Sequence, residues 1–279
     1  MVFVAVALAW AANDDVRTSL AQIRAALEPD GASIRTMVVR VRGPEGEAAP
    51  ITARQARTTI GNTRHVLTVV VTPPEAAGTA ILLSQSPDGP EDRWIYAPVV
   101  RRTRQVVPVL RHEPFLNSDF TLADLGFMDT RRTESFTVVS APADADGAGR
   151  LAIQETPQDQ SVYSRIVTSV DAERGVPRKR EFFDRAGRLW KIERFEDVRT
   201  VDGVETPMRL VMEDVQAGGR TEIAVSDVRR DVTLPETLFD PKRLSTAAAA
   251  DVWTATAAAR AGAREQPAPE TGAERAPGS

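Results

Sequence analysis

The fold is decided by the stretch DRWIYAP at residues 92–98, followed by RRTR at 101–104 and FLNSDFTLADL at 115–125. The first two segments predict a strand, a turn and a second, basic strand. The third predicts a capped helical turn, because polar residues that can cap a helix precede its apolar positions. None of the three carries the residue types that bond-breaking chemistry needs, so this region indicates a container or carrier.

The rest of the chain repeats the strand pattern. Segments 64–72, 79–84, 163–170 and 221–230 are rich in β-branched or alternating apolar residues, and turn signals such as 87–90 and 201–203 separate them at hairpin-like intervals. More than about ten antiparallel strands strain an open sheet unless it curls. We therefore expect a mainly β protein, built as one curved antiparallel sheet or incomplete β-barrel. The predicted helix at 14–27 and the turn at 121–125 are the short helical covers for its concave side.

Composition excludes several kinds of site. The 279 residues are 42% hydrophobic and 27% charged, with a formal net charge of −4, so there is no electrostatic reason to expect a nucleic-acid partner. Cys is absent and His occurs only twice. Disulfides, thiolate nucleophiles and Cys-based metal sites are therefore excluded, an all-His metal site is not expected from two histidines, and we expect no metal and no cofactor.

The two ends of the chain differ from its middle. Residues 1–12 form an apolar run that is too short for a membrane span but suits the core of an export signal, and Ala9-Trp10-Ala11 fits a cleavage site. Residues 246–279 are rich in Ala and Pro, and their last part is typical of a disordered tail. The predicted division is a signal-like segment at 1–12, a domain at 13–245 and a tail at 246–279, in a periplasmic protein.

Candidate catalytic groups have simpler explanations. His65 falls within a predicted strand, where we expect a surface or edge position, and His112 falls in a polar connection. Ser118 and Asp119 lack the Gly-x-Ser-x-Gly context of a hydrolase nucleophile. They are better explained as a turn that leads into a helix, so we assign no catalytic residue.

Large apolar residues offer the more specific hypothesis. Each is most simply a core residue, but several together could line an apolar hollow that holds a lipid chain. The candidates are Trp94, Tyr96, Phe115, Phe120, Leu125, Phe183 and Trp190. Arg102 and Arg104 are candidates for headgroup contacts through bidentate hydrogen bonds, against the alternative of a solvated strand face.

The chain resembles the outer-membrane lipoprotein-sorting proteins, the LolA-like family. The resemblance rests on Trp94-x-Tyr96-x-Pro98, Arg102-x-Arg104 and the block at 115–125, and extends through Phe183-Asp184-x-x-Gly187, Val201-Asp202-Gly203 and Phe239-Asp240. It covers roughly residues 14–244. It implies a strongly curved, incomplete antiparallel β-barrel closed by helices, whose apolar interior shields acyl chains across the periplasm.

The resemblance also implies the partners: lipid or lipoprotein acyl chains, an inner-membrane transporter of the RND type and an outer-membrane acceptor. Two other functions stay open on the residues alone. One is a non-catalytic envelope adaptor that binds through a sheet edge or the tail. The other is a hydrolase that uses His65 or His112.

Overall fold

The computed structural model describes residues 31–86, 89, 91–125, 136–140, 150–157, 161–171, 174 and 176–249, with the single residues 18, 21 and 253. The predicted signal-like segment at 1–12, nearly all of the predicted helix at 14–27 and most of the tail lie outside these residues. The chain divides into two units, residues 1–248 and 249–279. All the described strands belong to the first unit.

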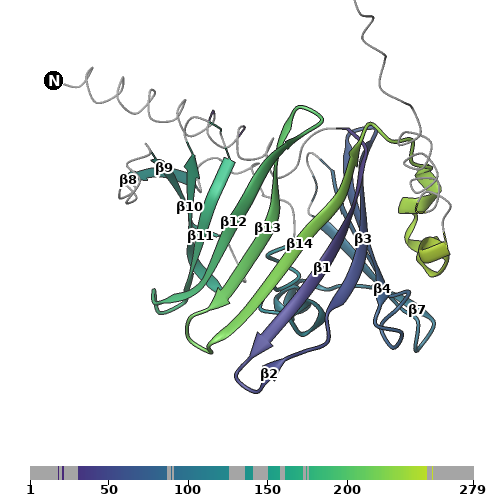
Figure 1. Cartoon of the computed structure of the whole chain (residues 1–279), viewed down its shortest axis with the longest axis horizontal. Helices are drawn as coiled ribbons and strands as arrows, with labels where there is room; N and C mark the ends of the chain where they lie inside the picture. The colour runs from purple at the N-terminus through teal and green to yellow at the C-terminus, as the bar shows by residue number, and fades with distance from the viewer. Residues whose placement is uncertain are drawn as a thin grey trace, which may run out of the picture. The chain divides into compact units, whose positions relative to one another are not determined.

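One antiparallel sheet contains every described strand (Figure 1). The strands are β1 (Ser33–Gly43), β2 (Gly46–Glu47), β3 (Ile51–Ile60), β4 (Thr63–Thr72), β5 (Ala80–Gln85), β6 (Glu91–Ala97), β7 (Arg102–Gln105), β8 (Phe136–Ser140), β9 (Arg150–Glu155), β10 (Tyr163–Asp171), β11 (Val176–Asp184), β12 (Leu189–Val201), β13 (Val204–Asp214) and β14 (Gly219–Arg230). The mainly β, antiparallel architecture expected from the sequence is confirmed.

The strand order is β7-β6-β5-β4-β3-β1-β14-β13-β12-β11-β10-β9-β8, with β2 paired to β1. Most strands that follow each other in sequence are neighbours; the exceptions are β2 and β3, which both pair with β1, and β7 and β8, which lie at opposite ends of the order. β1 also pairs with β14 and so joins the two ends of the chain's β-region. β7 and β8 end the order, so in the described residues the sheet stays open rather than closing into a barrel. This is the incomplete barrel that the sequence predicts.

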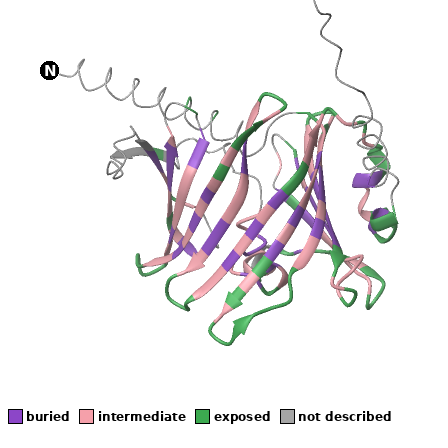
Figure 2. Ribbon diagram, in the orientation of Figure 1, coloured by how far each residue is buried: buried purple, intermediate pink, exposed green. Residues whose placement is uncertain are grey.

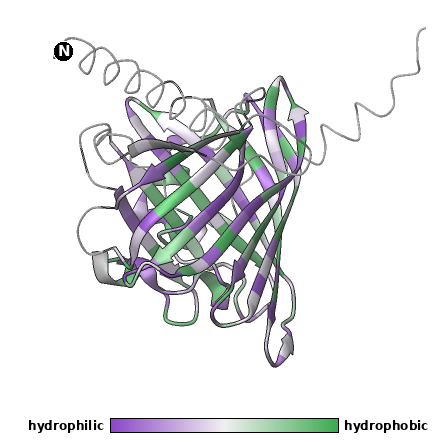
Figure 3. Cartoon of the chain, turned by 90° about the vertical axis from the view of Figure 1, so that its left-hand side faces the viewer, coloured by the Kyte–Doolittle hydropathy of each residue, from purple (hydrophilic) through white to green (hydrophobic). Residues whose placement is uncertain are grey.

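The sheet bends so that its two halves share an interior. Ile81 of β5 and Phe182 of β11 lie far apart in the strand order, yet both belong to one buried apolar cluster. Met37 of β1 and Ile223 of β14 join the same cluster from the middle of the sheet. Apolar and polar residues alternate along the strands, as a two-sided sheet requires (Figures 2 and 3).

The outer face of β4 has a cover of its own. Two 3-10 helices, η4 (Glu236–Phe239) and η5 (Pro241–Ala249), follow β14, and Leu238, Phe239 and Leu244 in them are buried. The Phe239 ring packs against His65 with ring centroids 5.6 Å apart. β4 lies between β3 and β5, so the expected edge position of His65 is wrong, and its half-buried side chain lies on the outer face of the sheet. η4 shields this residue.

Candidate functional site

The segment at 115–125, which we call the plug, lies against the concave face of the sheet. Phe115, Phe120 and Leu122 are buried in the shared apolar cluster. The short 3-10 helix η1 (Pro108–His112) leads into it, and η2 (Phe115–Asn117) is its first part. The chain reverses at Leu116 and Asn117, which have φ of 51° and 58°, and the Phe115 amide then donates to the Phe120 carbonyl at 2.7 Å.

Local polar groups fix the shape of the plug. The Thr121 amide donates to Asp124 Oδ2 at 2.7 Å, and the Asp124 amide donates to Thr121 Oγ1 at 3.2 Å. This reciprocal pair is the capped turn that the sequence predicts. The Phe120 amide donates to Ser118 Oγ at 3.2 Å. Ser118 therefore belongs to the turn, as expected from its sequence context.

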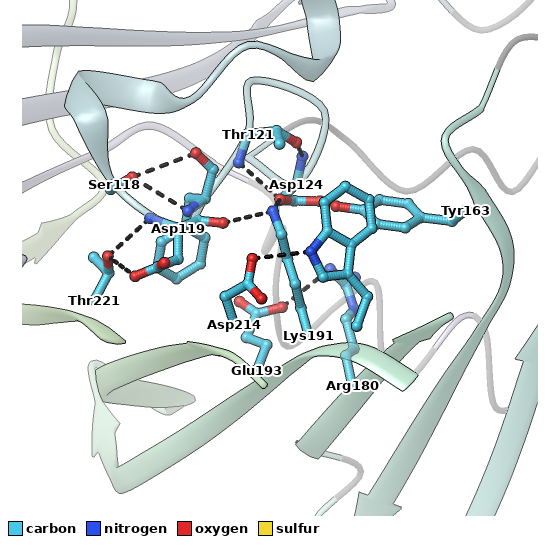
Figure 4. Close-up of polar contacts among 12 residues, drawn as sticks. Ser118, Asp119, Thr121, Asp124, Tyr163, Arg180, Lys191, Glu193, Asp214 and Thr221 are labelled. Atoms are coloured by element: carbon cyan, nitrogen blue, oxygen red, sulfur yellow. Dashed lines mark hydrogen bonds and ion pairs between the residues drawn. The ribbon is translucent and has the colours of Figure 1, made fainter. Parts of the chain in front are cut away.

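Lys191 anchors the plug to β12. Its ammonium donates to the Asp119 carbonyl at 2.6 Å and lies 3.5 Å from Asp124 Oδ2, with both side chains nearly inaccessible to solvent (Figure 4). The Tyr163 hydroxyl of β10 donates to Asp124 Oδ1 at 2.9 Å. Burial, then the Asp124 carboxylate, raises the pKa of Tyr163, so the hydroxyl keeps its proton and acts as a donor.

A second anchor joins the plug to β14. Thr221 Oγ1 donates to Asp119 Oδ2 at 2.7 Å and accepts the Asp119 amide at 2.9 Å (Figure 4). Burial raises the pKa of Asp119, although the hydrogen bond from Thr221 opposes that shift. A Cβ atom at Gly219 would overlap the Asp119 carboxylate. The close approach of the plug thus requires glycine at this position.

A cavity of about 100 Å³ remains between the plug and the sheet, which is room for several water-sized groups. Most of its wall is apolar. The apolar lining residues are Met37, Val66, Ile81, Leu83, Phe115, Phe120, Leu122, Leu125, Phe195, Leu210 and Ile223.

The rest of the wall is polar and comes mainly from two places. Arg180 and Glu193 form one pair, with Nη1 and Oε2 3.5 Å apart, but Glu193 Oε2 is buried without a hydrogen bond. Burial raises the pKa of Glu193 to about 7. The positive charge of Arg180 lowers this pKa, and the negative charge of Asp124 raises it further. The cavity therefore contains a carboxyl group that titrates near neutral pH.

The other polar part of the wall is a row across β1, β3 and β4. Arg35 Nε and Arg57 Nε donate to the same atom, Gln55 Oε1, at 2.8 and 2.9 Å. Gln55 Nε2 in turn donates to Thr68 Oγ1 at 3.0 Å. Burial, followed by the charges of Arg57 and Arg230, lowers the pKa of Arg35 well below its ordinary value. Burial and Arg230 lower that of Arg57 to about 10.

The structure brings together some of the residues that the sequence singled out. Phe115, Phe120 and Leu125 line the cavity, and Trp190 packs at the edge of the shared apolar cluster, 5.6 Å from the Tyr163 ring. Trp190 also donates from Nε1 to Asp214 Oδ2 at 2.9 Å. Ligand contact by these residues stays a prediction.

The other candidates lie away from this cavity. Trp94 and Tyr96 pair across the sheet with Leu82 and Ala80, on the face opposite Ile81 and the cavity. Phe183 stacks under Arg165, whose guanidinium carbon is 3.8 Å from the ring centroid. Arg102 and Arg104 are exposed on β7. Nothing in the structure tests whether these five contact a ligand.

Sequence reasoning missed the polar wall and the anchors. Lys191 and Glu193 alternate with Trp190 and Ile192 in β12, and of these four only Trp190 was a candidate for the cavity. A sequence signal for Lys191 and Glu193 was present. The apolar Phe195 lies on the same strand face as these two residues, so that face could have been assigned to the interior.

A curved, open antiparallel sheet with a plugged interior places the protein in the class of LolA-like folds. The chain belongs to the family whose model, described as an uncharacterized protein, matches residues 62–246, well over half of its length. A comparison with curated proteins finds no match. Within the described residues, no helix is long and apolar enough to cross a bilayer.

Three solved structures are similar over most of the chain. A Vibrio parahaemolyticus domain, described as an outer membrane lipoprotein-sorting protein domain, is 25% identical with a TM-score of 0.75, over 85% of this chain and 99% of that one. A DUF1329 family protein from Desulfovibrio piger is 19% identical with a TM-score of 0.74, over 84% and 98%. A LolA superfamily protein from Nitrosomonas europaea is 21% identical with a TM-score of 0.62, over 81% and 97%. The last two support the fold alone.

Proposed function

We propose that the protein is a non-catalytic periplasmic carrier that shields acyl chains of a lipid or lipoprotein beneath the plug during outer-membrane sorting. The observation that supports this most is the cavity between the plug and the concave face, whose wall is mostly apolar. The similarity to the Vibrio parahaemolyticus lipoprotein-sorting domain supports the same class of cargo.

The energetics favour such a cargo. Each buried CH₂ group contributes about 0.8 kcal/mol relative to water, so an acyl chain partitions into this interior without any specific bond. A long chain needs more room than about 100 Å³. Loading therefore requires the plug side chains Phe115 and Phe120 to move aside, so that the acyl chain replaces them against the sheet.

The anchors set the cost of that movement. The plug is held by Lys191, Thr221 and Tyr163 through hydrogen bonds and an ion pair, whereas Phe115, Phe120 and Leu122 only pack. Hydrogen bonds to charged groups, as these are, contribute about 1.5–3 kcal/mol each, which is comparable to two to four CH₂ groups of cargo. Exchange between plug and acyl chain is therefore balanced closely enough to be reversible.

A donor in the inner membrane and an acceptor in the outer membrane complete the proposal, with Arg102 and Arg104 contacting headgroups.

The test is the lipid content of the purified protein. We expect mass spectrometry of an organic extract to show acyl lipids in stoichiometric amounts, and an apolar fluorescent fatty-acyl probe to bind the delipidated protein. Leu210→Trp fills the cavity wall and should reduce probe binding, whereas Val215→Trp, at an exposed position, should not. Absence of lipid together with no probe binding would refute the carrier function.

A further inference from the structure

Exposed apolar side chains gather at one edge of the sheet. In the part of the chain that the structure describes, the large apolar residues that stand exposed are Val71, Val99, Val100, Val107 and Val215. β1 ends and β14 begins at the lower edge of the sheet in Figure 1. Antiparallel pairing puts the end of β4, the β6–β7 turn and the β13–β14 turn along this same edge. All of the exposed valines except Val107 therefore lie there.

The β6–β7 turn at 98–101, which we call the tip, carries the two most exposed of these side chains. Val99 and Val100 are 85% and 62% exposed, and the Arg101 amide closes the turn by donating to the Pro98 carbonyl at 3.2 Å. Turns ordinarily use Gly, Asn, Asp or Ser at such positions. Arg101 has a φ of 50°, where glycine is the usual residue. The tip residues thus suit the turn poorly, which is typical of functional positions.

Basic residues follow the valines directly. Arg101, Arg102 and Arg104, which we call the arginine flank, are all exposed. Residues 98–105 contain no Asp or Glu. The chain as a whole carries a formal net charge of −4, so the positive charge at the tip is a local feature of this edge.

The loop next to the tip adds little opposing charge. Residues 73–79 adjoin it, because a Cβ atom at Gly78 would lie 3.9 Å from Pro98 Cβ. Glu75 is the one acid in that loop, whose other residues are Pro, Ala, Gly and Thr. Three arginines therefore face one carboxylate across the two neighbouring loops.

An apolar tip with a basic flank fits the surface of an anionic bilayer. Apolar side chains enter the boundary between headgroups and acyl chains, and basic side chains are attracted to anionic lipids. Guanidinium groups also bind phosphate oxygens in a bidentate manner. An acidic protein is a less suitable partner, because protein interfaces are enriched in aromatic residues at their centre and residues 98–105 contain none.

We propose that the tip inserts Val99 and Val100 into the surface of an anionic phospholipid bilayer while the arginine flank contacts lipid phosphates. This goes beyond the proposed carrier function, because such docking requires no cargo, and it assigns the headgroup contacts of the flank to the bilayer. The plug reaches the same edge, where Asp119 meets the start of β14. Docking would therefore bring that end of the plug toward the membrane.

The first experiment detects insertion at a single position. The chain has no Cys, so Val99→Cys can carry one environment-sensitive fluorophore, such as a nitrobenzoxadiazole. With vesicles of phosphatidylglycerol and phosphatidylcholine, we expect its emission to rise and shift to shorter wavelength. Vesicles of phosphatidylcholine alone should have a much smaller effect. Val107→Cys with the same label is the matched control, because Val107 is 50% exposed but lies away from this edge.

The second experiment measures how strongly each part of the tip contributes. Titrating anionic vesicles into the protein labelled at position 99 gives a partition coefficient. Replacing two flank residues together, by Arg102→Gln and Arg104→Gln, should lower it about fivefold for each arginine, and Val100→Ser should lower it by about the same factor. Arg199→Gln, whose side chain is 64% exposed at the opposite edge, should leave it unchanged. Because the replaced side chains are exposed, the denaturant midpoint should not change.

The other outcomes overturn the inference. Unchanged emission at position 99 with anionic vesicles refutes insertion, and capture of an acidic protein by the same tip would then assign the surface to a protein partner. Equal changes at positions 99 and 107 refute docking by this edge, and equal affinity for neutral and anionic vesicles refutes the role of the flank. None of these results depends on lipid extracted from the purified protein, so the carrier function and the docking surface can fail separately.

Discussion

Glu193 should make the stability of the protein fall as pH rises. Its carboxyl group is 3% exposed, and burial raises its pKa from 4.5 to about 7 in the folded chain. The folded state then holds a proton that the unfolded chain releases near pH 4.5. The stabilisation is fully present below that pH and is lost as pH rises through 7.

The magnitude follows from the shift. At about 1.36 kcal/mol per pKa unit, the loss is on the order of 3 kcal/mol in total, of which about 2–3 kcal/mol falls between pH 5 and pH 8. Glu193→Gln removes the titrating group and keeps the shape of the side chain. We expect the variant to lack this loss, even if the absence of a carboxylate beside Arg180 lowers its stability by a constant amount at every pH.

The assay is denaturant unfolding of both proteins at pH 5 and pH 8. The quantity compared is the change in unfolding free energy between the two pH values, which cancels constant effects of the substitution. Glu196→Gln is the matched control, because Glu196 lies on the same strand but on the outer face, in an ion pair with Arg209. A difference between wild type and Glu193→Gln below about 1 kcal/mol would contradict the assigned protonation state.

Three further predictions concern the plug. Lys191→Met leaves Asp124 buried without its cation, so it should cost about 3–5 kcal/mol of unfolding free energy. It should also accelerate hydrogen exchange at 118–125, and unchanged exchange there would argue that Lys191 does not anchor the plug. Phe120→Ala should cost about 3–5 kcal/mol by denaturant titration, while Val215→Ala, at an exposed position, should stay within about 0.5 kcal/mol. Gly219→Ala should displace Asp119 and cost about 1–3 kcal/mol, whereas Gly43→Ala, with open space around it, should not alter plug exchange.

The architecture could be predicted because it depends on local signals. Strand segments such as 64–72 are marked by β-branched residues and bounded by turn residues, and hairpin spacing makes neighbours in sequence neighbours in the sheet. The turn at Thr121 and Asp124 is equally local, because both members of the reciprocal cap lie three residues apart. The block at 115–125 was therefore recognisable as a structural element, and its turn at 121–125 as a cover of the concave side.

Which face of β6 and of β12 points into the interior could not be predicted, because it depends on distant partners. In β6, Arg93 is buried and Trp94 faces outward, and in β12, Lys191 and Glu193 are buried while Ile192 lies on the other face. Alternation alone is symmetric: it says which residues share a face but not which face is inside. Lys191 can be buried because Asp119 and Asp124, about seventy residues earlier, meet it there.

The burial of charged side chains on these inward faces explains why the interior is both apolar and charged. An acyl chain alone would be served best by a uniformly apolar wall, since each buried charge costs desolvation energy unless it is paired. Lys191 offsets that cost by holding the plug, and Arg93 does so by pairing with Glu91. Arg35 and Arg57 instead share a neutral amide with each other. The Gln55 carbonyl oxygen accepts one hydrogen bond from each of these two guanidiniums, so each of them also has a polar contact inside the sheet.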